Sequence, residues 1–303
     1  MNKDLVSVII PTYGRPKFLP RCIESVCQQS YRNIEIVVVD DNGQGQAQQV
    51  ETERVVTSIE CDLPLTYIVH ERNGGGSAAR NTGAASAKGE FLCFLDDDDE
   101  YYPDRIAKQI EVLKHKNSED HLIKACTNLV IRRKGGIEVD RQPPKYQDNF
   151  LFEVLALKSS LYTGSTLLIY QEAFQTLGGY DERFRRNQDL EFMVRFFERY
   201  KITVLNEHLT ILNIDDRTNI PTYKKILETK QLFLEKFNPL INSFPKQQQR
   251  EIYTNNALEI AKVALWNKNI RGFFKAISNA NLSFREWVEF AADSFTKALK
   301  HIK

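Results

Sequence analysis

The chain has 303 residues, of which 42% are hydrophobic, so it can bury one large core and carry a smaller appendage. No segment approaches the roughly 18 consecutive apolar residues of a membrane-spanning helix, so we expect none. The net charge is only +1, but residues 222–303 alone carry +7. This imbalance indicates either an anionic partner for the C-terminal part or simply solvated helix faces.

The sequence predicts a cytoplasmic protein, which is soluble or held at the inner face of the cell membrane. The apolar run Val6–Ile10 is too short for a signal peptide. The cysteines form neither a CxxC pair nor a framework typical of secreted proteins, so we expect reduced thiols. There are five of them: Cys22, Cys27, Cys61, Cys93 and Cys126.

The first hundred residues alternate strand and helix patterns. Val6–Ile10 and Ile34–Val39 are unbroken β-branched runs, which are typical of strands buried on both faces. Further strands are predicted over 65–69 and 90–95, and helices over 17–29, 46–59 and 77–87. This alternation predicts an α/β fold with a doubly wound, mainly parallel sheet flanked by helices.

The remaining two thirds of the chain contain fewer strands. Helices are predicted over 103–116, 171–177 and 188–200, and strands over 122–132 and 163–170. Beyond Pro221 only helical patterns remain, over 222–238, 246–267, 271–279 and 283–302. We therefore divide the chain into a catalytic domain, 1–220, and a basic, all-helical C-terminal extension, 221–303.

Four consecutive aspartates, Asp96–Asp99, follow the predicted strand 90–95. Packing so many carboxylates together is unfavourable unless a cation neutralises them, and oxygen-rich sites suit Mg²⁺ or Mn²⁺. The carboxyl ends of strands in open α/β sheets are also where ligands bind. A solvated acidic turn is the alternative interpretation.

Two earlier strand ends carry residues suited to a nucleotide. Pro11–Arg15 follows the first strand, and Asp40-Asp41 ends the second. The ring of Tyr13 can lie beside a base, Asp41 can accept a hydrogen bond from a ring N–H such as that of uracil, and Arg15 can meet phosphate. Alternatively, the Asp pair could cap the following helix.

A glycine stretch, Asn73–Ser77, leads into a helix that carries Arg80. Glycines permit a tight turn, and a helix N-terminus offers N–H groups to an anion. The stretch is neither GxGxxG nor a Walker loop, which disfavours dinucleotide binding and P-loop NTP hydrolysis. Arg80 could reach a diphosphate or pair with the aspartates.

In their order and spacing these motifs resemble a family-2 glycosyltransferase of the GT-A fold, over roughly residues 5–220. The matching segments are Ser7–Tyr13, Ile23–Val26, Gln29–Tyr31, Val37–Asp41, Ala79–Gly83, Ala87–Glu90, Phe94–Asp99, Gly178–Phe184 and Asp189–Glu191 with Arg195. The resemblance implies inverting transfer of a hexosyl or N-acetylhexosaminyl group from a nucleotide-diphosphate sugar. UDP is the preferred nucleotide because Asp41 can accept a hydrogen bond from uracil, and GDP- and dTDP-sugars stay open. The acceptor would be a saccharide or lipid-linked saccharide in cell-surface glycan synthesis.

The resemblance also implies roles for individual residues. Asp98 would bind the metal, Mn²⁺ or Mg²⁺, with the register uncertain by one. Asp189 would be the catalytic base, from a family Glu-Asp pair that reads Gln188-Asp189 here; its alternative role is a helix N-cap. The expected nucleotide-binding residues are Pro11, Thr12, Tyr13, Arg15, Asp41, Gly76, Arg80, Asp96 and Asp97. The expected acceptor-side residues are Gly164, Ser165, Glu191 and Arg217, although the last could belong to an ordinary surface loop.

Two features leave alternatives open. The segment 283–302 carries an aromatic apolar stripe with basic flanks, which suits packing, a homodimer or peripheral membrane contact. It lacks the interleaved basic and stacking residues of a nucleic-acid-binding helix, so we expect no nucleic acid. The competing functions are a catalytically silent nucleotide-sugar-binding or scaffold protein and a sugar nucleotidyltransferase. The latter should carry a basic, glycine-rich loop after its first strand.

Overall fold

The computed structural model of the chain describes residues 1–144, 149–159, 161–215, 221–280 and 282. The chain divides into two compact units. The first comprises Met1–Asp148 and Ser160–Asp216, and the second comprises Asn149–Ser159 and Arg217–Lys303. Residues 149–159 thus group with the helical unit, although the sequence analysis assigns them to the catalytic domain. A boundary near residue 220 stays a prediction.

The first unit contains one mixed sheet with strand order β3-β2-β1-β4-β8-β6-β9-β5, and β7 pairs with β6. Its parallel half consists of β1 (Asn2–Thr12), β2 (Ile34–Asp40), β3 (Leu65–Val69) and β4 (Gly89–Phe94). The β-branched runs that predicted these strands are buried on both faces: every residue of β2 is buried. The α/β class and the mainly parallel, helix-flanked sheet are confirmed.

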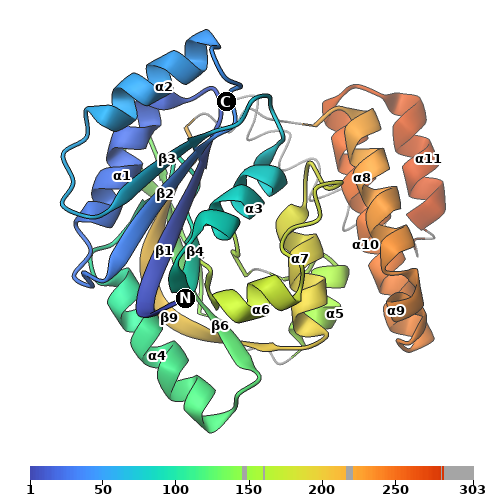
Figure 1. The fold of residues 1–303 in the computed structure, drawn as a ribbon. Coiled ribbons are helices and arrows are strands. Elements are labelled where there is room, and N and C mark those ends of the chain that lie inside the picture. Colours follow the sequence, from blue (N-terminus) through green and yellow to red (C-terminus); the bar gives the residue numbers. More distant parts are fainter. Residues whose placement is uncertain (145–148, 160, 216–220, 281, 283–303) are drawn as a thin grey trace. The chain divides into compact units, whose positions relative to one another are not determined.

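Helices cover both faces of this half of the sheet (Figure 1). One face of β1, with Val6, Val8 and Ile10, packs in a core with residues of α1 and α4. The other face meets α3, where a Cβ at Gly83 would lie 2.4 Å from Cγ2 of Ile9. Glycine at this position therefore lets α3 approach β1 closely. The helices of this unit are η1 (Pro16–Phe18), α1 (Leu19–Cys27), α2 (Ala47–Thr57), α3 (Gly76–Ser86), α4 (Arg105–Glu119), α6 (Gln171–Thr176) and α7 (Gln188–Phe197).

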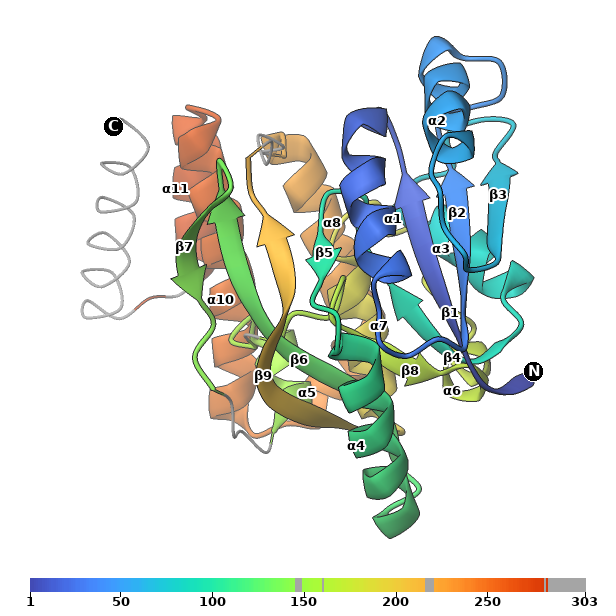
Figure 2. The ribbon, with the colours of Figure 1, turned by 90° about the vertical axis from the view of Figure 1, so that its left-hand side faces the viewer.

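The second half of the sheet is less regular. Its strands are β5 (Glu100–Tyr101), β6 (Ile123–Lys134), β7 (Ile137–Arg141), β8 (Leu168–Tyr170) and β9 (Lys201–Asn213). Figure 2 shows the long strands β6 and β9 side by side, and their pairing is parallel. β8 runs antiparallel to both β4 and β6. The sequence does not predict β9, and in place of the short β8 it predicts a longer strand over 163–170.

The second unit is helical throughout its described part, as predicted for the C-terminal region. Its helices are α5 (Phe150–Leu155), α8 (Tyr223–Lys236), α9 (Asn238–Asn242), α10 (Lys246–Trp266) and α11 (Ile270–Ala280). Side-chain amides tie α5 to α10, since Asn255 donates to the Ala156 carbonyl at 2.8 Å and Asn256 to that of Leu155 at 3.0 Å. The predicted helix 283–302 lies outside the described residues. None of the described helices has the length and apolar character needed to span a bilayer.

The expectation of reduced thiols is wrong for two of the five cysteines. Cys27, at the end of α1, and Cys61, before β3, form a disulfide with a Cα–Cα distance of 5.8 Å. Their separation of 34 residues gives no recognisable sequence spacing. The other three cysteines are buried thiols, in keeping with their role as small hydrophobic residues.

Candidate active site

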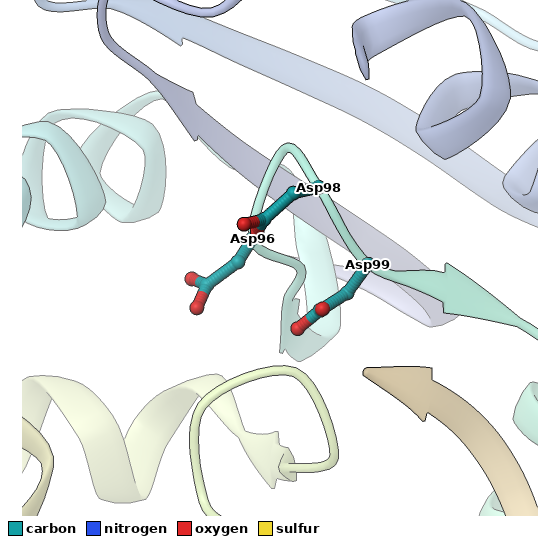
Figure 3. Close-up of side chains that lie close together, drawn as sticks. All are labelled: Asp96, Asp98 and Asp99. Carbon is teal, nitrogen blue, oxygen red and sulfur yellow. The ribbon is translucent and has the colours of Figure 1, made fainter. Parts of the chain in front are cut away.

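The aspartate run forms a turn between β4 and β5, and its side chains separate into two groups. Asp96, Asp98 and Asp99 each offer a carboxylate oxygen, and these oxygens lie within 4.8 Å of one another (Figure 3). Three such oxygens, two of them on buried side chains, match the donor set of a magnesium or manganese site. The sequence predicts the metal on Asp98 with the register uncertain by one, and the structure groups Asp98 with both Asp99 and Asp96 as candidate ligands.

Asp97 points to the end of β1 instead. Its Oδ2 accepts a hydrogen bond from Thr12 Oγ1 at 2.7 Å, and its Oδ1 pairs with the Arg15 guanidinium. The side chain is only 1% exposed, and this burial raises the pKa of Asp97 to about 7 even though the charge of Arg15 acts in the opposite direction. Asp97 therefore connects the acidic turn to the predicted nucleotide strand.

Arg15 also contacts the candidate metal ligand. Its Nη1 donates to Asp98 Oδ2 at 2.6 Å, so that one guanidinium joins two carboxylates. A second arginine, Arg21, donates to the Asp98 carbonyl at 3.0 Å. The predicted phosphate-binding residue thus lies against the acidic turn, at the place where a diphosphate bound by a metal would be expected.

Two residues outside the aspartate run fix the orientation of Asp99. Ser165 Oγ donates to Asp99 Oδ2 at 2.6 Å and accepts a bond from the Asp96 N–H at 3.2 Å. The Asn213 N–H, at the end of β9, donates to Asp99 Oδ1 at 3.2 Å. Ser165 was expected on the acceptor side, but it is buried beneath the acidic turn. Asn213 was missed because β9 was missed.

The first two strands end side by side, as predicted. Thr12 pairs with Asp40, and the Gly14 N–H donates to Asn42 Oδ1 at 2.7 Å. Pro11 and Thr12 are the last two residues of β1. Tyr13, which follows them, is 59% exposed, as a ring that stacks on a nucleobase requires. The helix-capping alternative for the Asp pair is wrong, because Gln46 is the N-cap of α2.

Asp41 holds the glycine stretch in place. It accepts hydrogen bonds from the backbone N–H groups of Gly74 at 2.6 Å and Gly75 at 2.7 Å, and from the Asn73 amide at 2.8 Å. His70 Nδ1 lies 2.8 Å from its Oδ1. The buried carboxylate is thus engaged through both oxygens, so a base N–H would have to share one of them. The contact of Asp41 with the nucleobase stays a prediction.

Arg80 adopts the second of its two expected roles. Its guanidinium pairs with Asp96 and donates to the Gly76 carbonyl at 3.1 Å, and the side chain is buried. Gly76 is exposed at the first position of α3. The pair therefore links the start of α3, where the N–H groups face an anion favourably, to the acidic turn.

A cavity of about 290 Å³ joins the acidic turn to Asp189, the predicted catalytic base. Asp189 stands at the second position of α7, after Asn187, which is the N-cap in a left-handed conformation (φ 55°). Asp189 is therefore not the cap residue. Burial raises the pKa of its carboxyl, while the Leu190 N–H and the Arg80 charge oppose this rise. The cavity is lined by Arg80, Asp96, Gly164, Tyr180, Arg185, Arg186, Asn187, Gln188 and Asp189.

The expected acceptor-side residues are not all brought together. Gly164 lines the cavity. Glu191 is fully buried and pairs with Arg195, whose Nε lies 2.6 Å from Glu191 Oε1, so it supports α7 rather than the cavity wall. Arg217 lies outside the described residues. Arg185 and Arg186, which do line the cavity, were missed because they have no counterpart in the motif that was recognised.

The chain is similar in sequence to known glycosyltransferases. The model described as glycosyl transferase family 2 matches residues 7–177. An uncharacterized glycosyltransferase of Rickettsia prowazekii is 31% identical over 194 residues, which are 64% of this chain and 58% of that protein. Another from Rickettsia typhi is 27% identical, covering 90% of this chain and 82% of its own length. The amylovoran biosynthesis glycosyltransferase AmsB of Erwinia amylovora is 24% identical, covering 85% and 84%.

Solved structures share the fold. S. aureus TarS 1-349, crystallised in complex with UDP, superposes with a TM-score of 0.53 at 17% identity, covering 90% of each chain. The mannosyltransferase PcManGT from Pyrobaculum calidifontis, in complex with GDP-Man and Mn²⁺, superposes with a TM-score of 0.59 at 18% identity. The superposition covers 98% of this chain and 86% of PcManGT.

Proposed function

Because this chain belongs to glycosyl transferase family 2, we propose that it moves a hexosyl or N-acetylhexosaminyl group from a nucleotide-diphosphate sugar, preferably UDP-linked, to an acceptor hydroxyl with inversion. The acceptor is a saccharide or lipid-linked saccharide in cell-surface glycan synthesis. One observation carries this proposal: a single cavity is lined both by Asp96 of the acidic turn and by Asp189. A donor held at the turn and a base opposite it would share that space.

The donor end is proposed for the tips of β1, β2 and β4. Tyr13 offers an exposed ring to the base, and the UDP and GDP-Man complexes of TarS and PcManGT support a nucleotide on this fold. Asp98, with Asp96 and Asp99, would hold Mn²⁺ or Mg²⁺. A bound divalent cation supplies electrostatic stabilisation of diphosphate charge.

The acceptor end depends on Asp189. The acceptor hydroxyl donates its proton to this carboxylate while its oxygen bonds to the anomeric carbon, and the nucleoside diphosphate departs with the electron pair of the broken C–O bond. A carboxyl whose pKa is raised by burial is a stronger base than an exposed one, provided that it is ionised at the working pH. Positioning in the cavity supplies the remaining acceleration.

A donor panel combined with one substitution tests the proposal. UDP-, GDP- and dTDP-sugars are screened by thermal shift and by donor hydrolysis, with Mn²⁺, Mg²⁺ or EDTA. Asp189→Asn should keep donor binding and lose about 10²- to 10⁴-fold in turnover, the usual scale for positioned proton transfer. Glu198→Gln, an exposed carboxylate at the end of the same helix, is the matched control. Near-full turnover in Asp189→Asn would contradict the assignment.

We also propose that the helical unit contacts either a membrane surface at the cytoplasmic face or a second copy of the chain. Its α11 exposes Ile270 at 70% and Phe274 at 61%. Arg271 and Lys275 are exposed on the same helix. Apolar and basic side chains on one helix suit an anionic lipid surface, and an apolar face also suits a protein partner.

A further inference from the structure

The ring of Tyr13, which is proposed to stack on the nucleobase, depends on its backbone for its position. The side chain is 59% exposed, and among the described residues it has no hydrogen-bond partner. The next residue, Gly14, has a left-handed backbone (φ 69°), which glycine adopts without strain. A Cβ at Gly14 would meet no heavy atom within 4 Å, so packing does not hold this turn either. The hydrogen bonds of the turn therefore determine where the ring lies.

Two hydrogen bonds hold the backbone on either side of Tyr13. The Asp41 N–H donates to the Thr12 carbonyl at 2.9 Å, and this bond continues the pairing of β1 with β2. The Gly14 N–H donates to Asn42 Oδ1 at 2.7 Å. The first bond joins two backbones and is independent of the side chains. The second exists only because residue 42 carries an amide.

The Asn42 amide has one orientation that satisfies its neighbours. Its Nδ2 donates to Asp40 Oδ1 at 2.8 Å and to Thr52 Oγ1 at 3.3 Å. A carboxylate can only accept hydrogen bonds, so the NH₂ group must face Asp40, and the amide oxygen is left for Gly14. Asp40 is fully buried, and its Oδ1 also accepts the Asn42 N–H at 2.8 Å. The buried carboxylate thus fixes the amide that holds Gly14.

Tyr67, on β3, fixes the other oxygen of this carboxylate. Its hydroxyl donates to Asp40 Oδ2 at 2.6 Å. Burial and the hydrogen bond to Asp40 raise the pKa of the Tyr67 hydroxyl, so it keeps its proton and remains a donor. A chain of hydrogen bonds therefore runs from β3 through Asp40 and Asn42 to Gly14, just beyond the tip of β1.

Arg15, which follows Gly14, is held in a different way. Its guanidinium pairs with the carboxylates of Asp97 and Asp98 in the acidic turn. Its position therefore does not depend on the Gly14 N–H. Loosening Gly14 should disturb the ring of Tyr13 and leave the proposed phosphate contact in place.

We propose that Asn42 is a positioning residue for the nucleobase: by holding the Gly14 N–H, its side chain sets the ring of Tyr13 in the orientation that stacks on the base. The inference rests on the proposed function, since it says how the nucleotide site of that function is held. Stacking of one base on an aromatic ring contributes roughly 5- to 150-fold to affinity. Part of this factor should be lost when the turn that carries the ring is released.

A double-mutant cycle on the full chain tests the inference. It compares wild type, Asn42→Ala, Tyr13→Ala and the variant with both substitutions. The Kd values of UDP, GDP, dTDP and pyrophosphate are measured by calorimetry with saturating Mn²⁺. The Kd of pyrophosphate divided by that of the tightest nucleotide gives the contribution of the nucleoside. Asn117→Ala is the matched control, because the Asn117 amide donates to the carbonyls of His121 and Ile123 and has no hydrogen bond with the tip of β1.

We expect Tyr13→Ala to lower the nucleoside contribution by roughly 5-fold or more, and Asn42→Ala to lower it by about 3- to 10-fold. Because Asn42 acts through the ring, the double variant should bind the nucleotide within about twofold of Tyr13→Ala alone. Pyrophosphate affinity should stay within about twofold of wild type in all variants, which shows that they are folded. Without ligand, the Gly14 N–H should exchange its hydrogen faster in Asn42→Ala than in wild type.

Three results would overturn the inference while nucleotide binding by the wild-type chain still supports the proposed function. They are an unchanged nucleotide affinity in Asn42→Ala, a loss of pyrophosphate affinity as large as that of nucleotide affinity, and additive effects of the two substitutions. Wild-type chain that binds none of the three nucleotides would contradict the proposed function itself, and the inference would fall with it. The two failures are therefore distinguishable.

Discussion

Replacing Ser165 with alanine should loosen the acidic turn. The Ser165 side chain is buried, and its hydroxyl makes two bonds there, to Asp99 Oδ2 at 2.6 Å and from the Asp96 N–H at 3.2 Å. Alanine removes both hydrogen bonds, because its side chain has neither a donor nor an acceptor. Asp99, 1% exposed, would keep the Asn213 N–H on its other oxygen. The substitution therefore tests whether this hydroxyl orients two candidate metal ligands.

The expected magnitude follows from the two bonds. A hydrogen bond to a charged carboxylate contributes about 1.5–3 kcal/mol, and a neutral one about 0.5–1.5 kcal/mol. We expect Ser165→Ala to lower the free energy of unfolding by roughly 2–4 kcal/mol. Loss of a residue that orients metal ligands typically weakens metal binding by about 10- to 100-fold, so the Mn²⁺ dissociation constant should rise by that factor.

Urea unfolding in EDTA and Mn²⁺ titration calorimetry measure the two effects separately. Ser118→Ala is the control, because Ser118 is exposed on α4 and bonds only a carbonyl of its own helix. An unfolding free energy within about 0.5 kcal/mol of wild type, together with unchanged Mn²⁺ affinity, would refute the role given to Ser165.

Three other predictions concern the acidic turn and the helical extension. Asp98→Asn should abolish the Mn²⁺-dependent rise in melting temperature that we expect with donor nucleotide, and an undiminished rise would exclude Asp98 as a ligand. The folded-state pKa of Asp97 is about 7, against an ordinary value of 3.8, so the folded chain keeps a proton that the unfolded chain loses between these values. The contribution of Asp97 to the free energy of unfolding, measured in EDTA, should therefore fall as the pH rises from 4 to 7. Asp97→Asn should remove this contribution from the pH dependence in urea titrations, and an unchanged pH dependence would contradict the raised pKa. Liposome flotation should be stronger for the full chain than for a chain lacking residues 283–303, and equal flotation would remove the membrane proposal.

The parallel half of the sheet could be predicted because its sequence signal is local. Strands such as β2 are buried on both faces, so their sequences are unbroken runs of β-branched residues. The polar residues that follow these parallel strands in sequence then lie together at the carboxyl ends of the strands, independently of the fold of the rest of the chain. The aspartate turn and the tip of β1 were predictable for this reason.

Strand β9 could not be recognised from the same signal. Its pairing with β6 jumps from Leu205 opposite Asn128 to His208 opposite Leu129, which leaves two residues of β9 out of register. Such a bulge breaks the alternation that marks a strand. Missing β9 in turn concealed Asn213, the second partner of Asp99.

Other features depend on contacts between distant segments. Ser165 reaches Asp99 across 66 residues, and Cys27 reaches Cys61 across 34. The residues next to Ser165 and Cys27 in sequence do not indicate which distant residue each of them contacts. The bonds of Asp41 to the glycine stretch likewise follow from how the loop after β3 folds back, which residue types alone do not specify.

The anomeric configuration of the first-formed product tests the central claim most directly. A single base, Asp189, acting opposite the departing diphosphate allows only one displacement at the anomeric carbon. Proton NMR of donor hydrolysis, recorded before the released sugar mutarotates, should show the anomer opposite to that of the donor. Release of a sugar with the donor's own configuration would contradict a mechanism in which Asp189 activates the attacking hydroxyl.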